Sequence, residues 1–347
     1  MSYEHLKTNA DASMYEFLGS LITYFDKIVE EEVDLCYLHS LDSFYDWDPF
    51  NERYGYLQCL LLYLLRYAYG YAYEYKYIYE KLLYSEKLID KVKKSDPAQL
   101  KVASIGCGNY LDYWSLVNLL NDKKENVRVC YTGIDLVDWL FSFRALEGDE
   151  IIPKESDKSD IFKYVLRDTN ELDYDIFFFP KSISEIPEAL EKLGEDLGGS
   201  NNKKDEFYIA VSYPYSNKDN DYAKKYNAEN LEATKTLVRI VTEQKKYKTN
   251  ANLSKLCLFE RKQSYYIRDY DSNFERNPEI DPDVEKYVTE ISKKCKKCSQ
   301  KPDKKCEERN YGCYNYTNEE ECCNKLNQKM LSTVNHIAYN IVSFTKL

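Results

Sequence analysis

The sequence lacks a surplus of positive charge. Its 48 Lys and Arg residues are outnumbered by 59 Asp and Glu residues, which gives a formal net charge of −11. Binding along nucleic acid in general requires enough Lys and Arg to neutralise the phosphates. The composition therefore excludes a general nucleic-acid coat protein, although it leaves room for a local basic groove.

The sequence also lacks a membrane-length apolar run and an apolar amino-terminal core. Its most apolar run, residues 57–65, is too short to cross a bilayer and is followed by Arg66. The start, from Met1 to His5, is polar, unlike a secretory signal peptide. An odd total of 11 cysteines disfavours a complete disulfide framework. We therefore expect an intracellular, cytoplasmic protein with reduced thiols and no membrane contact.

Residues 1–97 are expected to form a helical region that ends at Ser95–Pro97. Within it, seven tyrosines alternate from Tyr67 to Tyr79, a period that by itself would indicate a strand. The flanks are rich in Leu, Glu and Lys, and the segment is too long for one strand, so we predict a helix. The tyrosines then form two opposing stripes that pack on both sides. A stacking platform for bases is the functional alternative.

Residues 98–347 are expected to form an α/β domain. The expected strands are 101–105, 126–135, 161–166, 173–180 and 206–214, and the expected helices are 111–121, 136–143, 184–198 with Ser184 as its cap, and 231–241. Two further strands, 256–261 and 336–344, have no helix between them that would allow a parallel crossover. This order predicts a doubly wound, mostly parallel sheet with a carboxyl-terminal antiparallel hairpin.

A glycine turn follows the first of these strands. Gly106 and Gly108 lack a Cβ, so the backbone can approach a ligand closely and adopt positive φ. The N–H groups of the turn and of the next helix can bind a polar or anionic group. The second strand ends on Asp135, a carboxylate where α/β nucleotide folds hold ribose hydroxyls.

These two motifs, Ser104–Gly108 and Gly133–Asp135, resemble the first two motifs of class I S-adenosylmethionine (SAM)-dependent methyltransferases. The sequence departs from the family at Ser104, where many members carry an acid, and at Tyr110, where many carry a third glycine. The resemblance implies a SAM site formed by Gly106, Cys107, Gly108 and Asn109 at the aminocarboxypropyl end, Asp135 at the ribose and Asp168 at the adenine. The alternative is that the glycines form a tight turn and Asp135 caps the following helix.

Candidate catalytic residues follow the fourth strand. Many members that methylate nucleic-acid nitrogens carry Asn/Asp-Pro-Pro-Tyr/Phe there, and residues 179–185 of this chain do not match. By position, Lys181, Ser182 and Glu185 lie on the expected acceptor side, where they would align the acceptor or take its proton. The alternative is a solvated Lys181, with Glu185 interacting with a helix dipole.

A Cys- and Lys-rich insertion is expected at about residues 291–327. Four of its cysteines, Cys295, Cys298, Cys306 and Cys313, are candidate ligands for a structural Zn²⁺ ion, and the neighbouring lysines would lower the thiol pKa values. Disulfides in an oxidising compartment are the alternative. The insertion is basic in an acidic chain, which favours an RNA or protein acceptor.

Two functions follow from the sequence. The first is a SAM-dependent methyltransferase whose helical region and insertion shape the acceptor site. The second is a catalytically inactive methyltransferase fold that serves as an interaction scaffold, which would agree with Ser104, Tyr110 and the missing acceptor motif.

Overall fold

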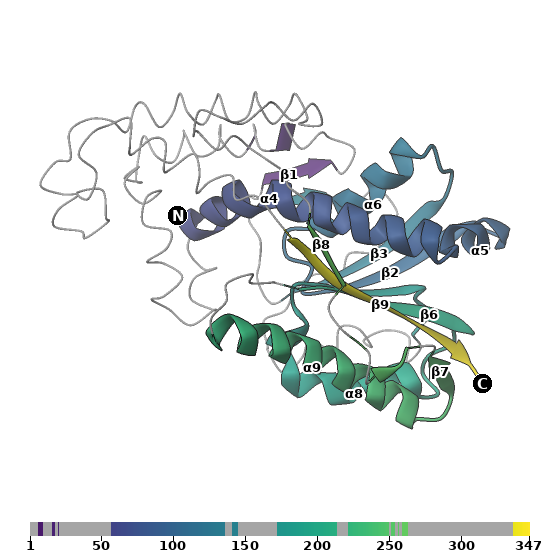
Figure 1. Ribbon diagram of the computed structural model, residues 1–347. Helices are drawn as coiled ribbons and strands as arrows, with labels where there is room; N and C mark the ends of the chain where they lie inside the picture. The colour runs from purple at the N-terminus through teal and green to yellow at the C-terminus, as the bar shows by residue number, and fades with distance from the viewer. Residues whose placement is uncertain are drawn as a thin grey trace, which may run out of the picture.

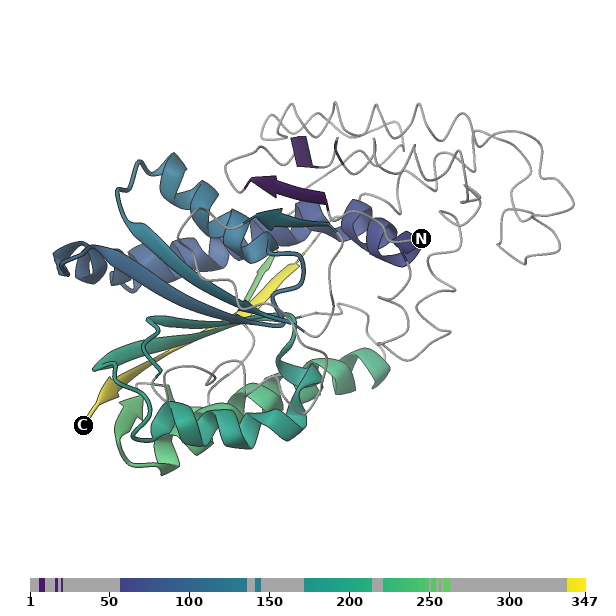
Figure 2. The ribbon, with the colours of Figure 1, turned by 180° about the vertical axis from the view of Figure 1, so that it is seen from behind.

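The chain forms a sheet with helices on both faces. The computed structural model describes residues 6–9, 16–17, 20, 57–135, 141–144, 172–213, 221–249, 251–253, 256, 259–262 and 336–347. Helices α4 (Leu57–Glu80), α5 (Leu88–Lys94) and α6 (Leu111–Asp122) lie on one face, and α8 (Pro187–Gly198) and α9 (Asp221–Glu243) lie on the other (Figures 1 and 2). Within these residues, no helix is long and apolar enough to span a bilayer.

The strand order defines the fold. The strands are β2 (Gln99–Ile105), β3 (Arg128–Ile134), β5 (Ile176–Pro180), β6 (Glu206–Ser212), β7 (Tyr247–Thr249), β8 (Phe259–Lys262) and β9 (His336–Lys346). They are ordered β3-β2-β5-β6-β9-β7, with β8 also paired to β9. The first four are parallel, whereas β9 is antiparallel to β6, β7 and β8. The predicted parallel sheet with an antiparallel carboxyl-terminal hairpin is confirmed.

An apolar core fills the space between the sheet and helices α8 and α9. The α8 side chains that repeat at helical spacing all lie in it, and β5 and β6 supply its other wall. Its central members are Phe177, Phe179, Leu190, Leu193, Leu197, Ile209, Val211, Leu237, Val238 and Val241. A strand that is covered on both faces needs apolar residues throughout, and β5 is buried at all of its positions.

The tyrosine-rich segment is the helix α4, as predicted. Tyr75 and Tyr79 pack on Phe178 of β5, with ring centroids 5.5 and 4.9 Å apart. One and two turns earlier, Tyr71 and Tyr67 stack on each other at 5.2 Å. The alternation of tyrosines therefore reflects packing of a helix against the sheet rather than a strand.

Three local predictions were wrong. Phe141–Arg144, expected within a helix, is strand β4, which pairs in parallel with β1 (Leu6–Asn9) in the region expected to be helical. The tyrosine-rich helix, expected to run on to Lys94, is interrupted after the π-helical turn Lys81–Ser85, where Lys87 has φ +58°. Ser184 does not cap α8, because its hydroxyl donates to Asn230. The expected strand 161–166 and the insertion 291–327 lie outside the described residues.

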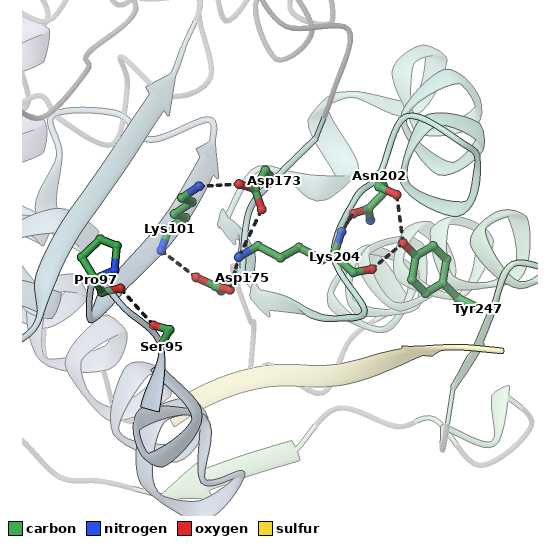
Figure 3. Close-up of polar contacts among 8 residues, drawn as sticks. All are labelled: Ser95, Pro97, Lys101, Asp173, Asp175, Asn202, Lys204 and Tyr247. Atoms are coloured by element: carbon green, nitrogen blue, oxygen red, sulfur yellow. Dashed lines mark hydrogen bonds and ion pairs between the residues drawn. The ribbon is translucent and has the colours of Figure 1, made fainter. Parts of the chain in front are cut away.

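A network of charges joins the amino ends of the parallel strands (Figure 3). The Lys101 N–H donates to Asp175 at 2.8 Å, and the Lys101 ammonium pairs with Asp173. Lys204 lies 2.7 Å from Asp175 and 3.2 Å from Asp173. The Tyr247 hydroxyl donates to the Lys204 carbonyl at 2.7 Å. This edge is therefore held by the protein's own charges, and it lies opposite the candidate site.

Candidate functional site

The glycine turn after β2 forms at the carboxyl edge of the sheet. Gly106 and Gly108 have φ values of +72° and +58°, which favour glycine. The N–H groups of Gly106 and Cys107 donate to the Ile134 carbonyl at 2.7 and 3.0 Å, and the Gly108 N–H donates to Asp135 Oδ2 at 2.6 Å. These three donors are thus bonded within the protein, which corrects the expectation that they are exposed to an anion.

Ser182 explains why residue 106 is glycine. A Cβ on Gly106 would overlap the Ser182 Cβ and lie 2.8 Å from its Oγ. The Ser182 hydroxyl donates to the Ile105 carbonyl and is buried. Ser182 therefore packs against the glycine turn. It was predicted to lie on the acceptor side, but its hydroxyl is buried and hydrogen-bonded within the protein.

Asn109 and Asp135 are the polar side chains of the turn. Asp135 is half-buried, and its carboxylate lies against the turn through the bond from Gly108. Asn109 is 2% exposed, and its side-chain nitrogen has no hydrogen-bond partner in the described part of the chain. Because buried polar groups are nearly always hydrogen-bonded, this amide indicates a missing partner.

Tyr110 and Cys107 close the other side of the turn. Tyr110 has φ +64°, and its ring lies so close to Gly133 that a Cβ there would overlap it. Burial raises the pKa of Tyr110 well above its usual range, and Cys107 and Asp135 add to the shift. The Cys107 thiol is buried. The large side chain at position 110 therefore packs into the space that Gly133 provides.

Lys181 does not extend into solvent. Its side chain is 11% exposed. The ammonium donates to Glu74 Oε1 at 2.8 Å and to the Tyr213 carbonyl at 3.0 Å. The same group lies 4.5 Å from the centroid of the Tyr71 ring. The Ser212 hydroxyl donates to the same Glu74 oxygen at 2.6 Å. The solvated alternative for Lys181 is wrong, and the lysine belongs to a buried cluster.

Sequence reasoning missed Glu74. It is fully buried on α4, and its second oxygen, Oε2, has no partner among the described residues. Burial raises the pKa of Glu74 and lowers the pKa of Lys181, and their mutual attraction opposes both shifts. One signal in the sequence could have indicated it: Glu74 is an acid within the tyrosine-rich segment that forms α4.

Glu185 is the candidate catalytic residue that retains solvent access. It lies in the short helix Ile183–Glu185 after β5, and the residue as a whole is exposed. Partial burial of its carboxyl group raises its pKa to about 7, and the charge of Asp135 adds to the shift. A carboxyl group that titrates near neutral pH can exchange protons with a substrate. Glu185 and Asp135 therefore act electrostatically on one site.

A second buried acid, Asp112, was also missed. The Tyr131 hydroxyl donates to its two oxygens at 2.8 and 3.0 Å, and the Tyr79 hydroxyl donates at 3.3 Å. Burial raises the pKa of Asp112 to about 6, although these hydrogen bonds favour the charged form. Asp112 lies in the first turn of α6 and links α4, α6 and β3 beneath the glycine turn.

Five of the predicted site residues lie outside the described part of the chain. They are Asp168, Cys295, Cys298, Cys306 and Cys313. Within the described ranges, no group of three or more His, Cys, Asp or Glu residues could hold a metal ion. The adenine contact and the zinc site therefore stay predictions.

Comparisons with known proteins give weak structural likenesses. No protein-family model matches the chain, and no curated protein does. Similar solved structures include phosphoethanolamine N-methyltransferase 2 of Haemonchus contortus in complex with SAM, at 11% identity and a TM-score of 0.30. That match covers 82% of this chain but 59% of the Haemonchus chain.

Two further structures are similar at the same level. The plantazolicin methyltransferase BpumL in complex with S-adenosylhomocysteine (SAH) has 11% identity and a TM-score of 0.34, covering 95% of this chain and all of that one (100%). A SAM-dependent methyltransferase from Archaeoglobus fulgidus has 15% identity and a TM-score of 0.29, covering 78% and 99%. At these scores the likeness carries no argument about activity, and the fold assignment rests on strand order and direction.

The contact between Gly106 and Ser182 predicts a non-additive pair of substitutions. Gly106→Ala should lower the free energy of unfolding by about 3 kcal/mol. The cost has two causes: alanine disfavours the left-handed backbone conformation, and its Cβ would overlap Ser182. In a Ser182→Gly background the overlap is removed, so the same change should cost only about 1–2 kcal/mol. Chemical denaturation of the four proteins measures this difference. Strictly additive costs would contradict the contact.

The raised pKa of Asp112 predicts a pH dependence of stability. Because the folded state holds a proton that the unfolded chain has already released, wild type should lose stability as pH rises from about 4 to about 6. Asp112→Asn cannot lose that proton. Its stability relative to wild type should therefore rise by roughly 3 kcal/mol over this range. Denaturation at pH 4 and pH 7 tests this, and a pH-independent difference would show that Asp112 stays charged.

Proposed function

We propose that the protein binds SAM at the carboxyl edge of β2 and β3 and transfers its methyl group to an acceptor. The observation that carries this proposal is the buried amide of Asn109, which has no hydrogen-bond partner among the described residues and lies in the glycine turn next to Asp135. In open α/β sheets, ligands bind at this edge. A nucleoside with a charged amino-acid tail would supply both an acceptor for the amide and hydroxyl donors for the carboxylate.

Each residue of the turn has a distinct role in this proposal. Asn109 would donate to the carboxylate of the cofactor tail, and Asp135 would accept from the ribose hydroxyls. Gly106, Cys107 and Gly108 would form the turn next to the aminocarboxypropyl end of the cofactor, with Gly106 leaving room for the Ser182 side chain behind the turn. Asp168 would contact the adenine, as the resemblance implies. Asp135 accepts from the Gly108 N–H, so the turn itself fixes the position of its carboxylate.

Glu185 is proposed as the proton acceptor of the reaction. SAM, when bound, supplies a methyl group attached to a sulfonium, so the acceptor atom needs alignment and, where it carries a proton, a base. Glu185 is exposed, and its pKa of about 7 leaves a large fraction as the carboxylate at neutral pH. The side chains of Ser182 and Lys181 are hydrogen-bonded within the protein, so they would position the glycine turn and not react with the acceptor.

The acceptor and the insertion complete the proposal. The basic insertion would dock RNA or protein, and Cys295, Cys298, Cys306 and Cys313 would hold a structural zinc ion in a cytoplasmic protein. About one equivalent of zinc is expected after purification under reducing conditions; its absence would contradict the metal site. Replacing Lys293, Lys294, Lys296 and Lys297 should abolish salt-sensitive RNA binding, and no binding by wild type at low salt would remove RNA as acceptor.

The bond between Gly108 and Asp135 favours a second candidate, the inactive scaffold. A carboxylate that satisfies a donor of the turn resembles a structural cap. A scaffold would leave the Asn109 amide unused and would bind neither SAM nor SAH. The two functions are therefore separated by cofactor binding.

Isothermal titration with SAH tests the proposal. Wild type should bind, and Asp135→Ala should weaken the affinity at least tenfold, because hydrogen bonds to the ribose are lost. Asp173→Ala is the matched control: it removes a half-exposed carboxylate at the opposite edge and should leave the affinity unchanged. Absence of heat in wild type would establish the scaffold. A large fall in the melting temperature of Asp135→Ala would make Asp135 a structural cap.

A further inference from the structure

A chain of contacts connects α4 to the glycine turn. Glu74 binds the Lys181 ammonium, and Lys181 directly precedes Ser182. Ser182 in turn occupies the space next to Gly106 and donates to the Ile105 carbonyl. Glu74 on α4 is therefore connected through Lys181 and Ser182 to Gly106. The contact between Ser182 and Gly106 determines how closely the turn can approach β5.

The backbone at Lys181 needs outside support. Its φ is +61°, a left-handed conformation that residues other than glycine rarely adopt without a surrounding constraint. Its N–H donates to the carbonyls of Phe179 and Ser212 at 3.0 and 2.9 Å. Its side chain is fixed by Glu74 and by the Tyr213 carbonyl. The direction in which Ser182 leaves β5 is thus set by contacts that Lys181 makes with α4 and β6.

The buried pair of Glu74 and Lys181 is not the arrangement that would give the highest stability. The Glu74 Oε2 atom is buried without a partner in the described part of the chain. Replacing a buried ion pair with apolar residues of similar volume often leaves stability unchanged or improved. A buried charge pair with one unsatisfied oxygen therefore indicates a role in fixing one conformation.

We propose that Glu74 is a positioning residue that acts through Lys181 and Ser182 to hold the glycine turn in its binding-competent shape. The inference rests on the proposed function, and it makes α4 part of the cofactor site instead of a separate region. The turn should then loosen when the pair is replaced, even where the fold as a whole keeps its stability.

The test replaces the pair with apolar residues, Glu74→Leu with Lys181→Met, in the full chain. Amide hydrogen exchange in the segment Gly106–Gly108 should accelerate at least tenfold, because the two N–H groups bonded to Ile134 open more often. Exchange in β6 should stay within twofold of wild type. SAH affinity should fall at least tenfold. The single variant Lys181→Arg, which keeps the charge opposite Glu74, should retain most of the wild-type protection and affinity.

Lys204→Met is the matched control. It removes ion pairs of similar length at the opposite edge of the sheet and should leave exchange in the turn unchanged. Unchanged exchange in the turn of the double variant, or equal acceleration throughout the sheet, would overturn the positioning role. If wild type fails to bind SAH, the proposed function fails, whereas selective opening of the turn would still support the positioning role.

Discussion

The structure depends on the close approach of two strand ends. Gly106, at the end of β2, has no side chain because the Ser182 side chain, just after β5, occupies that space. Two N–H groups of the turn bind the Ile134 carbonyl, so β3 is held at the same point. A Cβ at residue 106 would overlap the Ser182 side chain, so either Ser182 or the turn would have to shift.

The turn is organised by hydrogen bonds within the chain itself. Its donors bind Ile134 and Asp135, and its left-handed residues are supported by neighbours. A preorganised site loses less conformational entropy on binding. Among the described residues the Asn109 amide has no hydrogen-bond partner, and in the proposed function the nearby carboxylates of Asp135 and Glu185 accept from hydroxyl groups and take up a proton. An inactive scaffold that binds no cofactor would not use the Asn109 amide or these two carboxylates.

The sequence predicted the parts whose signals are local. Apolar runs and helical spacing indicated β5, β6, α6, α8 and α9, and the glycines indicated the turn. Strand β4 was missed because its partner, β1, lies more than a hundred residues earlier, and pairing across that distance leaves no local pattern. Glu74 and Asp112 were missed for a related reason: their burial depends on which helices pack together. Lys181 follows β5, as the order of elements indicated, but its ion pair with Glu74 on α4 joins residues more than a hundred positions apart and leaves no local pattern.

The central claim is that a ligand completes the hydrogen bonds of the glycine turn. A nuclear magnetic resonance titration of ¹⁵N-labelled protein with SAH, following the Asn109 side-chain amide, tests it most directly. The account predicts that both amide protons shift on saturation, together with the Gly108 backbone amide, and that the Lys204 backbone amide at the opposite edge does not. An unchanged Asn109 amide at saturating SAH would contradict it.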